Sequence, residues 1–181
     1  MTDPKELFDN PDQHWQFLTS PTDSSCEGQY FDREALPPGI VSKSQYQSLI
    51  EEITATVSAF SNQNRRGGLV VVGIDSDGGV IGTSHLTEQQ RNSISNIGPL
   101  LTNQAAHVRT HPCTGTDGKG TNLTLIYAPY ATTGICETPG PRPKAWVRQD
   151  AQNIPVDQHR REQLLREKRI GESGCGGEDQ N

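Results

Sequence analysis

A short apolar run near the middle of the chain places the strongest constraint on its fold. Leu69 to Ile74 (LVVVGI) is mostly β-branched and is broken only by Gly73. A run of this length and composition is typical of a strand that is covered on both faces. The next five residues, DSDGG, are those of a tight hairpin turn, and Val80 and Ile81 then resume the apolar pattern. We therefore expect a central strand at 69–75 and a return strand at 80–83.

The segment before this strand predicts a long helix. Ser42 and Gln45 have the spacing of a capping box, in which each side chain bonds the backbone N–H of the other residue. The apolar residues that follow recur with a helical period: Tyr46, Leu49, Ile50, Ile53, Val57 and Phe60. We expect a helix at 42–62 with one face on the sheet, and a turn at 62–68 that completes a β-α-β unit.

Shorter signals predict the remaining elements. They are one or two short helices within 5–18, an edge strand at 27–34, a helix from Thr87 to about 103, strands at 106–111, 122–128 and 144–148, a turn at 149–155, and a charged helix at 156–170. The result is an α/β (α+β) fold in which helices pack on a mixed β-sheet, in the order β-α-β-β-α-β-β-β-α. We expect an N-terminal helical and loop extension at 1–25, one domain at 26–170 and a disordered tail at 171–181.

Composition limits the class of protein. A chain of 181 residues with 31% apolar and 21% charged residues suits one compact domain. It has no apolar run of about 18 residues and no secretory signal, so we expect a cytoplasmic protein without a membrane partner. The cysteines lie at irregular spacings without a CxxC pair, which predicts neither a disulfide framework nor a zinc ribbon. The chain also lacks a Walker loop, a GxGxxG turn and a nucleophile elbow, which disfavours nucleotide hydrolysis and acyl transfer.

Charge is distributed unevenly along the chain. The net charge is −6, yet residues 142–169 carry eight basic and four acidic residues, whereas the first 60 residues carry ten acidic and three basic ones. Such asymmetry can give one face a positive potential despite the negative total. Solvated helix charges are the simpler interpretation of the same pattern.

Six segments in this order resemble Schlafen AlbA-type domains. They are Glu27 to Glu34 (an ExxxxEFK-like strand), Ser58 to Asn62 (SAFSN), Gly67-Gly68, Leu69 to Asp77 (the apolar strand closing on GIDSD), Val80 to Gly82, and Trp146 to Val156 (WVRQDAQNIPV). Together they span about 130 residues. The resemblance is imperfect, because Asp32 stands where the family has a second Glu and Glu34 stands where it has a Lys. These departures affect the inference of an activity more than the inference of the fold.

The resemblance implies a nucleic-acid-binding module, with RNA or DNA as its partner. Exposed cations suffice for base-independent contact with phosphates, and the candidates are Arg65, Arg66, Lys144, Arg148, Arg160 and Arg161. Two other functions stay open. One is a metal-dependent endoribonuclease, and the other is a protein-interaction or dimerisation domain, either as a homodimer or joined to further domains of a longer parent protein.

The resemblance also implies two candidate metal sites. A Schlafen-type nuclease would place Glu27, Asp32 and Asp75, with Asp77 in reserve, around Mg²⁺ or Mn²⁺ as both ligands and catalytic residues. Turn aspartates that bond local amides are the alternative for Asp75 and Asp77. A structural Zn²⁺ site would use His111, Cys113 and Cys136, although Glu137 stands where a fourth cysteine would be expected.

Overall fold

The computed structural model describes residues 2–20, 28, 30–102 and 106–173, and the side chains of 170–173 are not described. Its centre is a four-stranded mixed sheet with the strand order β1-β2-β4-β3. The strands are β1 (Phe31–Glu34), β2 (Gly68–Val72), β3 (His107–Thr114) and β4 (Gly120–Ala128). β1 runs parallel to β2, whereas β4 runs antiparallel to both β2 and β3. The predicted mixed sheet with packed helices is confirmed, and β2 is its buried inner strand.

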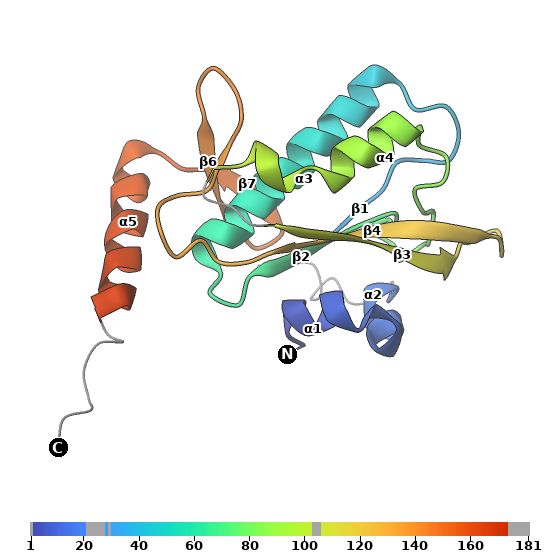
Figure 1. Cartoon of the computed structure of the whole chain (residues 1–181), viewed down its shortest axis with the longest axis horizontal. Coiled ribbons are helices and arrows are strands. Elements are labelled where there is room, and N and C mark those ends of the chain that lie inside the picture. Colours follow the sequence, from blue (N-terminus) through green and yellow to red (C-terminus); the bar gives the residue numbers. More distant parts are fainter. Residues whose placement is uncertain (1, 21–27, 29, 103–105, 174–181) are drawn as a thin grey trace.

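Helices cover both faces of this sheet (Figure 1). One face packs against α3 (Lys43–Gln63), α4 (Glu88–Ser95) and the short helix η2 (Gly98–Leu100), and the other packs against α1 (Pro4–Asp9), η1 (Pro11–His14) and α2 (Trp15–Leu18). Val70 and Val72 point into the first layer, and Leu69 and Val71 point into the second. This alternation between two apolar layers explains why β2 is apolar at every position.

The capping boxes at the start of α3 and α4 are both present. The helix α3 then leads through a glycine turn into β2. Gly67 has φ 74°, a conformation that favours glycine, and a Cβ atom there would lie 2.5 Å from the carbonyl oxygen of Ala128. The β-α-β unit predicted around α3 is therefore confirmed, with β1 and β2 parallel.

The helix predicted from Thr87 to about 103 is shorter in the structure, because α4 ends at Ser95 and η2, which contains Pro99, follows it. Three further predicted elements differ. The return strand expected at 80–83 is reduced to a single bridge between Ile74 and Val80. Gly73 and Gly82 have positive φ, and the Gly82 N–H bonds the Gly73 carbonyl, so the chain curls back and leaves no extended segment to pair. The strand at 144–148 exists but does not join the main sheet, and the turn expected at 149–155 contains another strand.

These residues form a second, three-stranded sheet. Its strands are β5 (Glu137–Thr138), β6 (Lys144–Gln149) and β7 (Gln152–Pro155), paired antiparallel in that order. Figure 1 shows β6 rising beside α3, with its long connecting loop at the top of the molecule. We call the segment from β5 through β6 the β5–β6 hairpin.

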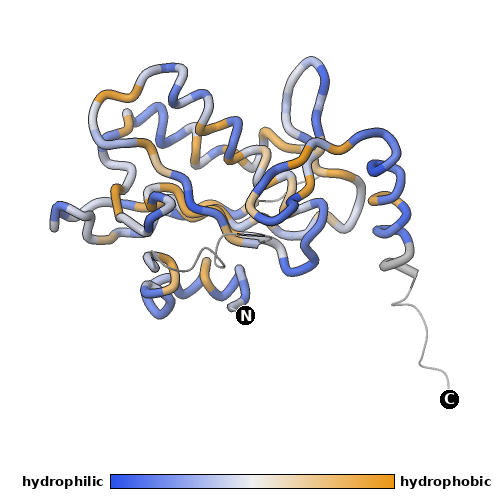
Figure 2. Tube along the Cα trace, turned by 180° about the vertical axis from the view of Figure 1, so that it is seen from behind, coloured by the Kyte–Doolittle hydropathy of each residue, from blue (hydrophilic) through white to orange (hydrophobic). Residues whose placement is uncertain are grey.

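The last helix, α5 (Gln158–Ser173), packs on this second sheet through Leu164, which contacts Ile135 and Ala145. Most of its length is hydrophilic (Figure 2). Helix α5 extends to Ser173, three residues into the tail expected from 171, and residues 174–181 lie outside the described residues. Within the described part of the chain, no helix has the length and apolar character needed to cross a bilayer.

Candidate functional site

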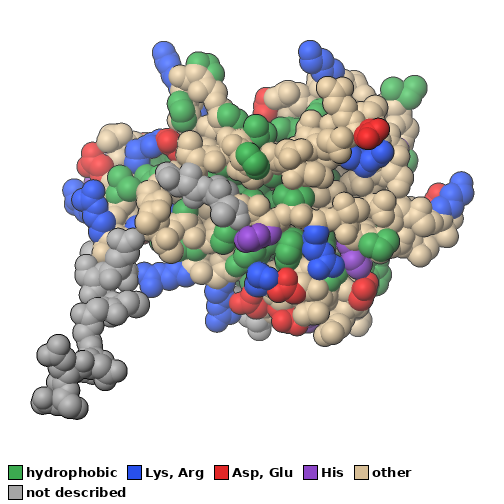
Figure 3. Space-filling model, in the orientation of Figure 1, with side chains coloured by type: hydrophobic (Ala, Val, Ile, Leu, Met, Phe, Trp, Pro, Cys, Tyr) green, Lys and Arg blue, Asp and Glu red, His purple; other side chains and the backbone are tan. Residues whose placement is uncertain are grey.

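A groove of about 970 Å³ lies between the N-terminal half of α3 and the β5–β6 hairpin. The wall on α3 includes Gln47, Ile50, Glu51 and Glu52. The opposite wall is the hairpin, with Arg142, Lys144 and Trp146, and Asn153 of β7 also lines the groove. Lys or Arg side chains protrude at the tip of the loop above β6 (Figure 3). The groove therefore combines cations, carboxylates, an aromatic ring and amide groups.

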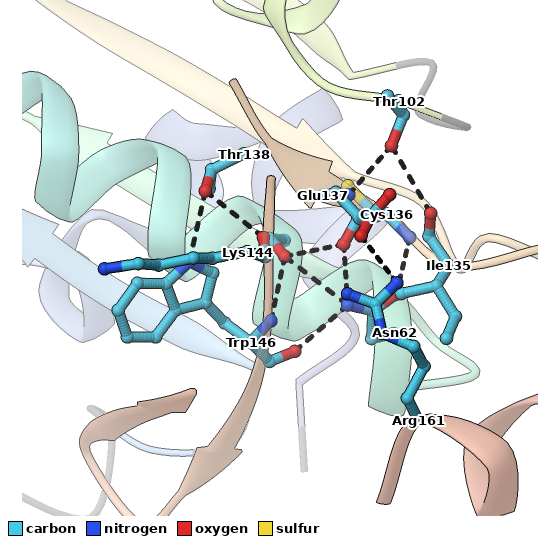
Figure 4. Close-up of polar contacts among 10 residues, drawn as sticks. Asn62, Thr102, Ile135, Cys136, Glu137, Thr138, Lys144, Trp146 and Arg161 are labelled. Atoms are coloured by element: carbon cyan, nitrogen blue, oxygen red, sulfur yellow. Dashed lines mark hydrogen bonds and ion pairs between the residues drawn. The ribbon is translucent and has the colours of Figure 1, made fainter. Parts of the chain in front are cut away.

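The hairpin is held against α3 by two buried side chains of the SAFSN segment (Figure 4). Asn62 Nδ2 donates to the carbonyls of Cys136 and Trp146 at 2.9 and 3.0 Å, and its Oδ1 accepts from the Cys136 N–H at 2.7 Å. Ser58 Oγ donates to the Cys136 carbonyl at 2.8 Å and accepts from the Trp146 N–H at 3.2 Å. Because an unpaired buried backbone group is costly, these bonds fix the position of the hairpin.

A buried ion pair lies beneath the same strands. Arg148 Nη2 is 3.0 Å from Asp32 Oδ1, and the two side chains are 1% and 11% exposed. Arg148 also donates to the Gly28 carbonyl and to Asn153 Oδ1. Thr56 of α3 donates to the other oxygen of Asp32 at 3.2 Å. This network joins β1, α3 and the β6–β7 hairpin, so Arg148 serves the interior of the protein.

The prediction that Arg148 contacts phosphate is therefore corrected. A guanidinium that is 1% exposed and already bonded to a carboxylate cannot reach a ligand on the surface. The sequence alone could not show that Arg148 is buried and Lys144 exposed, since both are cations of one strand. Both side chains lie on the same face of β6, because they are four residues apart on a strand. Their exposure differs because Arg148 reaches Asp32 and the Gly28 carbonyl inside the protein, whereas Lys144 begins the strand next to an exposed loop.

The other predicted phosphate contacts divide into two groups. Arg65 and Arg66 are exposed in the turn after α3, at the opposite end of that helix from the groove, and Lys144 is exposed on β6. Arg160 pairs with Glu167 at 3.2 Å, and Arg161 pairs with Glu137 at 2.6 Å. Arg65, Arg66 and Lys144 are therefore better placed than the two paired arginines of α5 to meet a phosphate.

The structure does not bring the described candidate carboxylates together. Asp32 pairs in register with Val70, in the middle of β2, whereas Asp75 lies five residues after Val70 and beyond the end of β2 at Val72. Asp75 Oδ1 accepts from the N–H groups of Asp77 and Gly79 at 3.0 and 2.7 Å, as expected of a turn aspartate. Glu27 lies outside the described residues. Asp32 and Asp75 therefore do not fit a shared Mg²⁺ or Mn²⁺ ion.

The predicted zinc ligands lie on opposite faces of the main sheet. His111 and Cys113 face the N-terminal helices, where His111 Nε2 is 2.9 Å from Asp12 Oδ1. Cys136 is buried on the α3 side, and this burial raises the pKa of its thiol to about 12. The sheet separates the three residues, so they do not fit one zinc ion. Among the described residues, no group of three His, Cys, Asp or Glu side chains is placed to hold a metal.

Sequence reasoning missed Arg142, Trp146, Ser58 and Asn62 as parts of the site. One signal was available for Ser58 and Asn62, because the last turns of α3 (TATVSAFSNQ) contain small polar residues and no charge. Residues 53–62 are all buried in the structure, and Thr56, Ser58 and Asn62 bond residues of the second sheet or its border. A helix that is buried all round indicates a second packing layer, which a single amphipathic face would not need.

Comparison with known proteins supports the fold and the family. The family model described as Schlafen, AlbA_2 matches residues 40–157. The structure is similar to the crystal structure of the DIP2311 protein from Corynebacterium diphtheriae, with a TM-score of 0.56 and 18% sequence identity. The similarity covers 97% of this chain and 33% of that one, so this chain spans about a third of its structural relative. No curated protein matches the sequence significantly.

Proposed function

Because this chain belongs to the Schlafen AlbA_2 family, we propose that it is a nucleic-acid-binding module whose contact surface is the groove between α3 and the β5–β6 hairpin. The family is consistent with such a role. The observation that carries the proposal is the hairpin itself, which presents two exposed cations and a half-buried tryptophan to the groove.

The charge of the hairpin wall, and not the charge of the whole groove or of the whole protein, supports this function. The protein as a whole has a net charge of −6, so a phosphate chain would be repelled from much of its surface. Arg142 and Lys144 are both exposed on one wall of the groove, and no ion pair is formed by either side chain in the described structure. Cations of this kind supply the sequence-independent part of nucleic-acid affinity. Arg65 and Arg66 form a second exposed pair for a longer ligand.

The geometry does not favour the nuclease alternative. Asp32 is neutralised by Arg148, and Asp75 is occupied by backbone amides of its own turn. Neither carboxylate is free to hold a divalent ion beside a scissile phosphate.

The test is a binding titration by fluorescence anisotropy with labelled RNA and DNA. The Arg142→Ala/Lys144→Ala variant should bind about tenfold more weakly at low salt. It should also have a flatter dependence of log affinity on log salt, by about 0.7–0.9 for each lost phosphate contact. Lys119→Ala is the matched control, because Lys119 is an exposed lysine near the distant β3–β4 turn.

Two results would contradict the proposal in different ways. If the double variant binds like the wild type with the same salt dependence, nucleic acid does not contact this groove. If the wild type binds neither RNA nor DNA, the nucleic-acid function is wrong. The protein-interaction or dimerisation alternative would then be tested by measuring the mass in solution by light scattering.

A further inference from the structure

The two walls of the groove differ in charge and in chemistry. The hairpin wall carries Arg142 and Lys144, whereas the α3 wall carries the carboxylates of Glu51 and Glu52. Glu51 accepts a bond from Gln47 at 3.0 Å, and Glu52 accepts one from Asn153 at 2.9 Å. A ligand in this groove therefore meets cations on one side, and hydrogen-bond acceptors with negative charge on the other.

Trp146 is the aromatic side chain of the hairpin wall, and the protein interior does not use it fully. Its ring lines the groove and is half-buried, and it belongs to none of the three apolar clusters formed by the described residues. Its Nε1 donates to Thr138 Oγ1 at 3.4 Å, and Lys144 Nζ lies 6.0 Å from the ring centroid (Figure 4). The ring is thus oriented before any ligand binds, with a cation beside it.

The loop that completes the hairpin wall is stiffened by its composition. Residues 139–143 read PGPRP, so Arg142 has a proline on each side. Each proline fixes its own φ and restricts the residue before it. The ends of this loop are strands held on α3 by Ser58 and Asn62. Less backbone entropy is therefore lost when a ligand contacts Arg142 or Trp146, although the Arg142 side chain must still be ordered.

We propose that the groove is selective for single-stranded nucleic acid, with a base stacked on Trp146, its phosphates on Arg142 and Lys144, and base edges toward Glu51. This inference rests on the proposed nucleic-acid function. A single strand has phosphates on one side and bases on the other, which matches two unlike walls. Base amino groups donate hydrogen bonds that a carboxylate accepts. A duplex carries phosphates along both edges and would place one row against Glu51 and Glu52.

Stacking provides affinity that does not depend on sequence, since every base has an aromatic face. Single strands expose these faces, whereas a duplex covers them with neighbouring bases. The groove is thus built to distinguish strandedness and not base identity. Both RNA and DNA single strands have this chemistry, and the 2′-hydroxyl is what could separate them.

The experiment compares four ligands of one sequence: single-stranded RNA, single-stranded DNA, and each of them annealed to its complement. Oligonucleotides of about 12 nucleotides suit the purpose, since single-strand-binding folds cover roughly 4–16. The single strands should bind about tenfold or more tightly than the duplexes. Unequal binding of the two single strands would identify which of them the groove accepts better.

Tryptophan emission tests the stacking directly. The chain has two tryptophans, and Trp15 lies in α2 on the far face of the main sheet. In Trp15→Phe, emission therefore reports on Trp146 alone, and unlabelled single strands should quench it in proportion to binding. Trp146→Leu should weaken single-strand binding about tenfold, within the range measured for loss of one stacked base. Trp146→Phe should keep most of the affinity because it keeps an aromatic face.

The α3 wall is tested by Glu51→Gln, which keeps the shape of the side chain and removes its charge. This variant should narrow the preference for single strands, because a duplex phosphate would no longer be repelled there. Equal binding of single strands and duplexes by the wild type would overturn the inference and leave the proposed function intact. Binding of single strands to Trp15→Phe without quenching of the Trp146 emission would also overturn the inference and leave the proposed function intact. If the wild type binds none of the four ligands, both the inference and the proposed nucleic-acid function are wrong.

Discussion

The two sheets of this protein both pack on α3, but they are held there by different forces. The main sheet meets the helix through apolar side chains such as Ile53, Val57 and Phe60. The second sheet meets it through buried hydrogen bonds of Ser58 and Asn62, and through the Asp32–Arg148 pair on its border with β1. Apolar burial is non-directional, whereas hydrogen bonds require a particular geometry. The apolar contacts of the main sheet therefore supply most of the net stability. The polar contacts fix the position of the groove, and they become costly only when one partner is removed and the other stays buried.

The largest effect is expected from breaking the ion pair that borders the second sheet. Arg148→Met leaves Asp32 buried without its cation, and breaking a buried pair in this way typically costs about 3–5 kcal/mol. Urea unfolding followed by circular dichroism measures this loss. An Asp32→Leu/Arg148→Met variant should recover part of it, since no unpaired charge then remains. A loss below about 1 kcal/mol in the single variant would show that water or another group replaces Arg148.

A truncation in the main sheet should destabilise the protein without altering the groove. Leu125 of β4 is fully buried in the layer that faces the N-terminal helices. Leu125→Ala should cost about 2–5 kcal/mol through lost burial and a cavity. At temperatures where the variant remains folded, its affinity for nucleic acid should equal that of the wild type. Weaker binding by the folded variant would contradict the separation of stability from groove position.

The converse variant removes a polar support of the hairpin. Asn62→Ala removes the Asn62 bonds of the Cys136 N–H and the Trp146 carbonyl, whereas the Cys136 carbonyl keeps its bond from Ser58. We expect a loss of about 1–3 kcal/mol. Its effect on nucleic-acid affinity should exceed that of Leu125→Ala, although its effect on stability is smaller. Asn96→Ala is the control, because Asn96 is exposed and, among the described residues, its side chain bonds only a carbonyl of its own helix. Unchanged binding by Asn62→Ala would mean that the hairpin is positioned by other contacts.

The smallest effect concerns Lys168, which anchors α5 beside the second sheet. Lys168 Nζ donates to the Ala131 carbonyl and lies 4.6 Å from the Tyr130 ring centroid. Burial lowers the pKa of Lys168 from 10.5 to about 8, so above pH 8 the native state releases a proton that the unfolded chain keeps. The free energy of unfolding should therefore rise with pH from about 8, by at most about 1.4 kcal/mol per pH unit.

The rise of the free energy of unfolding with pH should stop near pH 9, because the thiol of Cys136 contributes in the opposite direction. The pKa of its thiol is raised by burial from 9.0 to about 12, so above pH 9 the unfolded chain loses a proton that the native state retains. The contributions of Lys168 and Cys136 to the free energy of unfolding then oppose each other, until Lys168 is also deprotonated in the unfolded chain. Urea unfolding between pH 7 and 9 should show the rise in the wild type and not in Lys168→Met. The same rise in both proteins would assign it to another group.

Local patterns allowed the first half of the fold to be predicted well. The capping boxes at Ser42 and Thr87 and the apolar run after Gly68 all specify elements through residues that are close in sequence. The second sheet was not predicted as a separate unit, because β5 has two residues and β7 has four, too few to show a period. Its separation from the main sheet follows from contacts between segments about 80 residues apart, such as Asn62 with Cys136 and Trp146.

The candidate site shows the same division. The sequence by itself determined the family, the central β-α-β unit and which residues carry charge, because these depend on residue identity and local order. Only the tertiary structure decided which charges are available. Arg148 and Lys144 are four residues apart on one strand, yet one is buried against Asp32 and the other is exposed at the groove. Solvent exposure depends on which distant segments pack together, and these contacts leave no periodic signal in the sequence.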